Sequence, residues 1–151
     1  MDKKCCHEPL NEDQIKEILT KNGLNRTKGK VQILGAISSS HRPLSVVEIH
    51  SLIKENCDVS TVFRTITQFK EKNLIIEVNL EEGFFRYEMN SADDDHDKHH
   101  HHHVRCRVCG DIQNIEKCDL SAFEKAIAKL GFKNMEHRLE FSGICSKCSK
   151  N

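Results

Sequence analysis

The fold is decided by the stretch VSTVFRTITQFK at residues 59–70. Its apolar side chains recur at Val59, Val62, Ile66 and Phe69, which is the spacing of one face of an α-helix. The opposite face carries hydroxyl, amide and guanidinium groups, contributed by Ser60, Thr61, Arg64, Thr67 and Gln68. Because such groups bind phosphates and the edges of bases, this pattern is typical of the recognition helix of a helix-turn-helix.

Three more helices are predicted upstream. They run from Asn11 to about Gly23, from Thr27 through Ile37, and from Ser45 to about Glu55. Asn11 and Ser45 each stand three residues before a Gln or Glu, which is the spacing of a capping box at the start of a helix. Only the short turn 56–58 separates the third helix from the fourth, as a helix-turn-helix requires.

A β-hairpin is predicted directly after these helices. Residues 74–80 and 84–89 have the composition of strands, and Glu81-Glu82-Gly83 between them contains a turn-forming glycine. This hairpin is expected to be the wing of a winged helix. A helix-turn-helix pattern alone is only moderately specific, since many pairs of helices pack in this way without binding DNA.

The distribution of charge matters more than its sum. The formal net charge is zero, yet no acidic residue occurs between Ile18 and Val47, where Lys21, Arg26, Lys28, Lys30 and Arg42 lie. A run of like charges is more often a solvated helix face than a binding surface, but this one is also consistent with a cationic face for nucleic acid.

Composition changes abruptly at residues 90–98, which are polar and acidic and predict an exposed linker between two domains. Five consecutive histidines follow at residues 99–103, and because the run is internal it is not a terminal tag. In an extended strand alternate histidines point to opposite faces, so one strand has ligands for two metal sites. Imidazole suits zinc, iron, nickel and copper alike, and therefore does not name the metal.

The strongest motif is a pair of Cys-x-x-Cys knuckles, Cys106 with Cys109 and Cys145 with Cys148. Two such knuckles complete a tetrahedral four-thiolate site, which has no open position and is therefore structural. A redox role for either pair is disfavoured, because no thioredoxin-like βαβ pattern surrounds it. A zinc deaminase is excluded as well, because neither His-x-Glu nor Pro-Cys-x-x-Cys occurs. We therefore predict no enzymatic activity.

The cysteine count also bears on location. There are eight cysteines in 151 residues, but the N-terminus lacks a long apolar segment and no apolar run is long enough to span a bilayer. We therefore expect a cytoplasmic protein with no membrane association, whose thiols bind metal rather than form disulfides. Cys5, Cys6, Cys57 and Cys118 are left outside the knuckles and are more often passive thiols than ligands.

The segment between the knuckles predicts a small α+β module. It contains a strand at 112–115, a helix that Asp119 caps and Gly131 ends, and a returning strand at 135–141. A module of this size commonly needs a metal or a partner subunit to stay folded.

Over about residues 13–148 the chain resembles the ferric uptake regulator (Fur) superfamily of bacterial metalloregulators. The resemblance rests on Gly23 through Thr27 with Ile33-Leu34, on Ser60 through Thr65, and on the histidine cluster with Cys106, Cys109, Gly110, Cys145 and Cys148. It implies an α+β protein with a winged helix-turn-helix DNA-binding domain at 1–89, an acidic hinge at 90–98, and a small α/β dimerisation domain with a four-cysteine zinc site at 99–151. It further implies a homodimeric repressor that binds an AT-rich palindromic operator in double-stranded DNA, with metal as co-repressor.

The resemblance also suggests residues for the DNA contacts. Phe63 and Arg64 match recognition-helix positions that touch DNA in the family, and Lys30 matches a basic position in the second helix. Phe63 stands where the family usually has tyrosine, so it keeps apolar contact with thymine methyl groups and loses a hydroxyl. Together with the polar face of the fourth helix, the expected DNA-binding residues are Lys30, Ser60, Thr61, Phe63, Arg64 and Thr67.

Two metal sites besides the cysteine cluster follow from the same resemblance. The regulatory site at the hinge is expected to use Glu88, His101, His103 and His41, and a second site without cysteine to use His100, His102, His137 and Glu116. The family's histidine before the third helix aligns with Pro43, so His41, two residues away, is the substitute. The family's usual acid five residues after the second knuckle cysteine is Asn114 here, and Glu116 lies close by.

The sensed metal stays open between Zn²⁺ and Fe²⁺, beside a structural Zn²⁺ in the cysteine cluster. Thiolates and imidazoles are softer ligands than oxygens, which favours zinc slightly and the zinc-responsive branch of the family with it. A peroxide-sensing relative that uses iron or manganese is one alternative. A metal storage or delivery protein that does not bind DNA is another, and a DNA-binding measurement separates it from a regulator.

Overall fold

The computed structural model describes residues 9–53, 57–90, 102–115, 119–134 and 139–150. The chain divides into two compact units, Met1–Ala92 and Asp93–Asn151, and each is described by itself. No helix in the described ranges is both long and apolar enough to cross a membrane.

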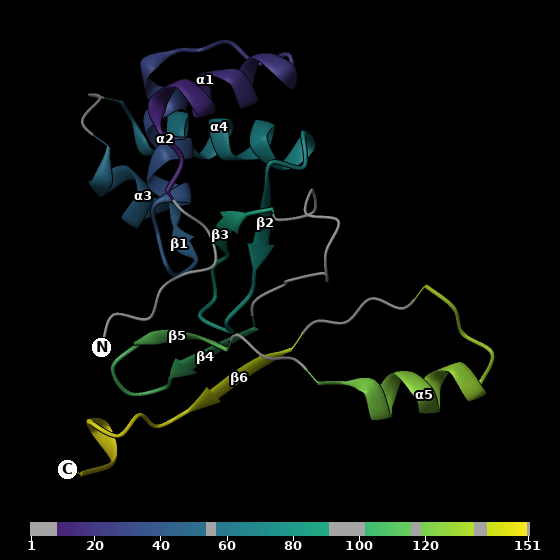
Figure 1. Cartoon of the computed structure of the whole chain (residues 1–151). Helices are drawn as coiled ribbons and strands as arrows, with labels where there is room; N and C mark the ends of the chain where they lie inside the picture. The colour runs from purple at the N-terminus through teal and green to yellow at the C-terminus, as the bar shows by residue number, and fades with distance from the viewer. Residues whose placement is uncertain (1–8, 54–56, 91–101, 116–118, 135–138, 151) are drawn as a thin grey trace. The chain divides into compact units, whose positions relative to one another are not determined.

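The first unit packs four helices against a small antiparallel sheet (Figure 1). Its helices are α1 (Glu12–Lys21), α2 (Lys28–Ser38), α3 (Val46–Leu52) and α4 (Val59–Glu71), and its strands are β1 (Leu44–Ser45), β2 (Ile75–Val78) and β3 (Arg86–Met89). The strand order is β1-β3-β2, with both pairs antiparallel. Helix pair α3–α4 followed by the β2–β3 hairpin is the predicted winged helix-turn-helix.

The capping boxes that predicted α1 and α3 are both present. The backbone N–H of Gln14 donates to Asn11 Oδ1 at 2.9 Å, and the Asn11 N–H donates to Gln14 Oε1 at the same distance. Ser45 and Glu48 form the same reciprocal pair at the start of α3. Helix α3 ends at Leu52, earlier than predicted, and residues 54–56 lie outside the described part of the chain.

The core of this unit unites all four helices with the sheet. Its most deeply buried side chains are Leu19, Ile33, Leu34, Ile49, Val62, Ile66 and Phe69. One expectation for α4 was wrong: Val59 is 44% exposed, and Thr65 is buried instead. Positions 62, 65, 66 and 69 form one continuous helical stripe, whereas Val59 is the first residue of the helix and lies beyond the packed surface.

Strand β1 was not predicted, because two residues are too short to show an alternating pattern. It pairs Leu44 with Tyr87 and Ser45 with Arg86, and so extends the wing hairpin to three strands. Through β1 the wing sheet is continuous with the start of α3, which is why the wing is held against the helix-turn-helix.

A buried arginine strengthens this connection. Only 8% of the Arg86 side chain is exposed; it donates from Nη1 to Glu48 Oε2 at 2.5 Å and from Nη2 to Glu82 Oε1 at 3.1 Å. Arg42 Nη2 lies 2.8 Å from the other Glu48 oxygen. Burial raises the pKa of Glu48, but hydrogen bonds from Arg42 and Ser45 and the charge of Arg86 outweigh it and lower that pKa to about 2. Glu48 therefore stays ionised and links α3, the wing and the loop before β1.

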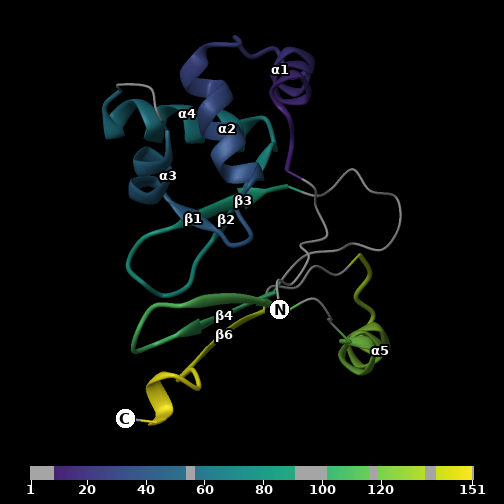
Figure 2. The same ribbon diagram turned by 60° about the vertical axis from the view of Figure 1, so that its left-hand side comes forward.

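The described part of the second unit contains a three-stranded mixed sheet and the α-helix α5 (Figure 2). Its strands are β4 (His102–Cys106), β5 (Ile112–Ile115) and β6 (Glu140–Gly143), followed by the short 3-10 helix η1 (Cys148–Lys150). The strand order is β5-β4-β6; β4 pairs antiparallel with β5 and parallel with β6. The returning strand was predicted at 135–141, of which residues 135–138 lie outside the described ranges.

Helix α5 (Ser121–Lys129) lies apart from these strands in both views (Figures 1 and 2). Asp119 was expected to be its N-cap, but the cap position is Leu120 and carries no side-chain hydrogen bond. The Asp119 carboxylate instead accepts from the backbone N–H and the hydroxyl of Ser121, two residues on. Asp119 thus stabilises the turn before the helix and lies one residue before the N-cap position.

Candidate metal centre and nucleic-acid interface

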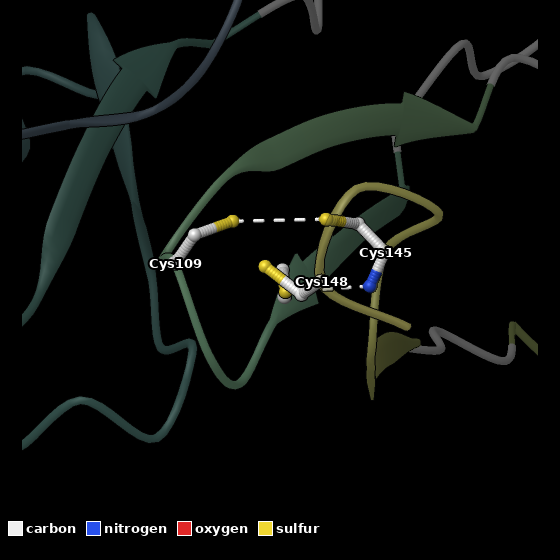
Figure 3. Close-up of side chains that lie close together, drawn as sticks. Cys109, Cys145 and Cys148 are labelled. Carbon is white, nitrogen blue, oxygen red and sulfur yellow. Dashed lines mark hydrogen bonds between the residues drawn. The ribbon is translucent and has the colours of Figure 1, made fainter. Parts of the chain in front are cut away.

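The four predicted knuckle cysteines come together in one cluster. The sulfur atoms of Cys106, Cys109, Cys145 and Cys148 all lie within 4.8 Å of one another, and Figure 3 shows Cys109, Cys145 and Cys148 pointing toward a common centre. A tetrahedron with metal–sulfur bonds of about 2.3 Å has sulfur–sulfur edges of about 3.8 Å. The distance of 3.7 Å between the sulfurs of Cys109 and Cys145 fits that edge.

Strand register brings the two knuckles together. Cys106 ends β4 and is paired with Gly143 at the end of parallel strand β6, so Cys145, two residues farther on, reaches the same place. The backbone N–H of Cys145 donates to Cys106 Sγ at 3.3 Å. Gly110 has a φ of 75°, which lets the first knuckle turn tightly from β4 into β5.

Four thiols this close together do not all ionise readily, because neighbouring thiolates would repel one another. Backbone N–H donors, those of Cys109 and Cys145 first, lower the pKa of Cys106 to about 6. Hydrogen bonds with the thiols of Cys145 and Cys109 raise the pKa of Cys148 to about 12. A bound divalent cation removes this conflict because it stabilises all four thiolates, so the donor set fits a structural zinc ion. Among the cysteines that the structure describes, none forms a disulfide.

The two described histidines of the run are almost completely buried. His102 and His103 are neighbours on β4 and therefore point to opposite faces of the strand. Nδ1 of His102 lies 3.1 Å from the carbonyl oxygen of Leu139, and Nδ1 of His103 lies 3.1 Å from Oδ1 of Asn114. A ring whose Nδ1 is held by a protein oxygen presents Nε2 to a metal, which is the usual arrangement of ligating histidines.

The other predicted metal ligands are not brought together among the described residues. Glu88 is half-buried on β3 and His41 is exposed before β1, both in the first unit. His100, His101, His137 and Glu116 lie outside the described residues. The predicted hinge and second sites therefore stay predictions. The structure describes Glu88, His41 and His103 of the first and His102 of the second.

Five of the six predicted DNA contacts lie on the exposed face of α4. Ser60, Thr61, Phe63, Arg64 and Thr67 are all exposed, whereas Lys30 is half-buried on α2. Phe63 is a large apolar side chain with 54% of its surface exposed. The Thr67 hydroxyl donates to the carbonyl oxygen of Phe63 at 3.0 Å, and the side chains of this face are open to solvent.

Sequence reasoning missed an apolar pocket beside Phe63. It has a volume of about 440 Å³ and is lined by Ser45, Val46, Val47, Phe63, Phe84, Phe85 and Tyr87. Phe84 and Phe85 come from the wing and are about half exposed. The sequence carried no signal for this pocket, because Phe63 on α4 and the adjacent Phe84 and Phe85 in the wing are far apart in the chain.

Comparison with known proteins decides the family. The model of the ferric uptake regulator family matches residues 21–142, which is most of the chain. The chain belongs to the ferric uptake regulator family. The ferric uptake regulation protein of Bacillus subtilis is 31% identical over 144 residues, covering 91% of this chain and 93% of that protein.

Two further proteins of the family are similar to this chain over most of its length. The peroxide operon regulator of Bacillus subtilis is 28% identical over 138 residues, covering 89% of this chain and 90% of that protein. The structure of the Helicobacter pylori regulator Fur, described as having three functional metal binding sites, matches with a TM-score of 0.75 and 24% identity, covering 95% of this chain and 97% of that one. That structure supports the fold alone.

Family membership settles the general function. The chain is a metal-responsive, DNA-binding transcription regulator of the Fur family and not an enzyme, as predicted. The predicted fold class is confirmed too: a helical winged-helix unit precedes a small α/β unit whose four-cysteine cluster fits zinc.

Proposed function

We propose that the protein is a homodimeric repressor that binds an AT-rich palindromic operator when a regulatory Zn²⁺ is bound, with Fe²⁺ as the less favoured signal. The observation that carries this proposal is the composition of β4. One strand supplies Cys106 to the closed thiolate cluster and two buried imidazoles, His102 and His103, on opposite faces. A closed structural site next to separate histidine ligands is what a sensor needs, because only the histidine sites are free to exchange metal.

The regulatory site is proposed to contain His103 with His101, Glu88 and His41, and the second site His102 with His100, His137 and Glu116. Neutral imidazole is a good ligand for zinc and iron, and few carboxylates in the set make manganese less favoured. Because the first set draws on residues of both units, bound metal would select one angle between them. Two recognition helices then match successive major grooves about 34–36 Å apart.

The DNA contacts are proposed to come from α4. Arg64 is exposed and suits guanine edges or phosphates, Ser60, Thr61 and Thr67 suit phosphates, and Phe63 suits thymine methyl groups. Lys30 on α2 adds a phosphate contact. Because phosphates supply much of the affinity, binding is expected to fall steeply with salt.

The partner of the second unit is proposed to be a second copy. No residue of α5 is buried, and Phe123, Ile127 and Leu130 lie on one face at helical spacing. Phe123 is 67% and Leu130 75% exposed. A small helix with an uncovered apolar face is stabilised when an identical face covers it, and a two-fold dimer matches a palindromic operator.

The double change Phe123→Glu and Leu130→Glu is therefore expected to raise the dimer dissociation constant at least about tenfold. Burial of one such side chain is worth about 1.5–3 kcal/mol, and an added carboxylate opposes it. Sedimentation velocity across a range of protein concentrations measures the change. Lys125→Glu, on the opposite face of the same helix, is the control; equal weakening by both variants would contradict an interface on the apolar face.

The proposed function is tested by metal content and DNA binding together. Metal per chain is measured before and after mild chelation, and zinc or iron(II) is then added while binding to an AT-rich palindromic duplex is followed. One metal that resists chelation, with DNA binding restored by a second, supports the proposal and names the signal. Metal uptake without DNA binding under any loading would favour a metal storage or delivery protein.

In the same assay Arg64→Ala is expected to weaken binding to the duplex by about 1–3 kcal/mol, which is about fivefold to 150-fold. Fluorescence anisotropy at moderate salt measures it. Lys133→Ala removes one positive charge from the second unit and is expected to change affinity little. Full affinity of the Arg64 variant would remove α4 from the DNA interface.

A peroxide-sensing regulator is the second candidate, and the likeness to the peroxide operon regulator of Bacillus subtilis favours it. It predicts that iron, but not zinc, makes the DNA complex sensitive to hydrogen peroxide. Exposure of the zinc and iron complexes to peroxide in parallel separates the two regulators.

A further inference from the structure

We infer that Asn114 is a positioning residue that sets the tautomer of His103 and thereby the affinity of the regulatory metal site. The inference rests on the proposed function, since it takes His103 as a ligand of that site. In this role Asn114 sets how tightly the site binds metal through its contact with His103, and it does not itself touch the metal.

The geometry begins with strand register. His103 of β4 and Asn114 of β5 are directly opposite each other in the antiparallel pair, so their side chains share one face of the sheet. Asn114 Oδ1 lies 3.1 Å from Nδ1 of His103, and only 2% of His103 is exposed. An amide oxygen only accepts hydrogen bonds, so the ring proton lies on Nδ1 and the lone pair on Nε2.

His102 provides a comparison on the other face of the same strand. Its Nδ1 lies 3.1 Å from the carbonyl oxygen of Leu139, another atom that only accepts. Both imidazoles therefore present Nε2, but by different means. A backbone oxygen accepts from His102, so that hydrogen bond does not depend on the side chain at position 139. The hydrogen bond of His103 depends on the side chain at position 114, so a single substitution there can change it.

The chemistry of the acceptor sets the strength of the ligand. A carboxylate that accepts from Nδ1 makes the imidazole a stronger electron donor to metal and adds a negative charge near the cation. The amide of Asn114 orients the ring without that charge. Asn114 is therefore expected to keep the regulatory metal in place but exchangeable, as suits a sensor that must release its metal.

The test uses the full-length protein with only its tightly held zinc. Nitrogen-15 NMR of the histidine side chains gives the tautomer of His103, and titration with Zn²⁺ against a competing chelator gives the affinity of the second metal. The variants are Asn114→Leu, which keeps the size and removes the acceptor, and Asn114→Asp, which restores it with a charge. Gln113→Ala is the control, because Gln113 is the exposed neighbour whose amide bonds Asp111 instead.

In the unaltered protein we expect His103 to carry its proton on Nδ1. Asn114→Leu should lose this preference and bind the second zinc about 10–100-fold more weakly, the usual effect of removing a partner of a ligating histidine. Asn114→Asp should recover the Nδ1 proton and bind at least as tightly as the unaltered protein. The tautomer of His102 and the tightly held zinc should be unchanged in all variants.

A proton on Nε2 of His103 in the unaltered protein would overturn the inference without any variant. So would a second-zinc affinity in Asn114→Leu within about twofold of the Gln113→Ala control. DNA binding is not a readout of this test. A protein that shows the expected tautomer and zinc affinities but binds no DNA would overturn the proposed function and leave the role of Asn114 intact.

Discussion

Cys145→Ser is expected to abolish the tightly held metal and to unfold the second unit. Cys145 supplies one of four sulfurs within 4.8 Å of one another, and its N–H also donates to Cys106 Sγ. Binding of a structural zinc ion contributes about 10–16 kcal/mol to the folding of small zinc domains, because the site does not exist in the unfolded chain. Three thiolates and a hydroxyl do not replace a closed four-thiolate site.

The second unit has little else to hold it together. Among its described residues only Cys106 and Ile112 are buried and apolar, and α5 has no buried residue at all. A domain of this size without a large core depends on a metal or a partner. We therefore expect loss of metal to remove the dimer and operator binding as well.

Elemental analysis after mild chelation, and circular dichroism during heating, measure this prediction. Cys57→Ser is the matched control, because Cys57 lies in the first unit between α3 and α4, outside the cluster. That variant should keep one tightly held metal per chain. If Cys145→Ser also kept it and melted like the unaltered protein, the cluster would not be a structural metal site.

Arg86→Ala is expected to destabilise the first unit by about 3–5 kcal/mol, the range found when one partner of a buried ion pair is removed. The change removes the cation that contacts both Glu82 and Glu48. Glu48 keeps Arg42 and its capping contacts with Ser45, so the wing loses more than α3 does. Weaker operator binding should follow, since the wing is then no longer held at one angle to α4.

Tyrosine fluorescence during denaturant unfolding reports this unit alone. Tyr87 is the only tyrosine of the chain, there is no tryptophan, and Tyr87 is buried beside Arg86 on β3. Lys16→Ala is the control, because Lys16 pairs with Glu12 on the exposed surface of α1 and such pairs contribute little to stability. A loss of equal size in both variants would mean that the Arg86 network adds nothing beyond a surface pair.

Helix positions were predictable because their signals are local. The caps at Asn11 and Ser45 and the apolar spacing of α4 involve residues within one or two turns of each other. The predictions failed where an element has no local sequence pattern or where that pattern is ambiguous. Two-residue β1 has no pattern of its own, and at the start of α5 the Asp119 carboxylate bonds Ser121 rather than capping the helix.

The candidate sites also differ in whether local sequence patterns could predict them. The two Cys-x-x-Cys pairs were enough to predict a four-sulfur site, because a spacing of three positions already places each pair on one ion. The spacing of residues 42, 48, 82 and 86 did not predict their ion-pair network, because the chain has many other charged residues that could have paired in the same way. The neighbourhood of Phe63 with Phe84 and Phe85 was equally out of reach.

Local chemistry along the chain was therefore sufficient for the winged helix, the cysteine knuckles and the family resemblance, because periodicity, capping and ligand spacing act between near neighbours. Only the folded chain revealed that parallel pairing of β6 with β4 closes the cysteine cluster, that Arg86 anchors the wing, and that Asn114 faces His103. Each of these depends on strand register or burial between distant residues. Those contacts are selected by the packing of the whole unit, which short-range patterns do not encode.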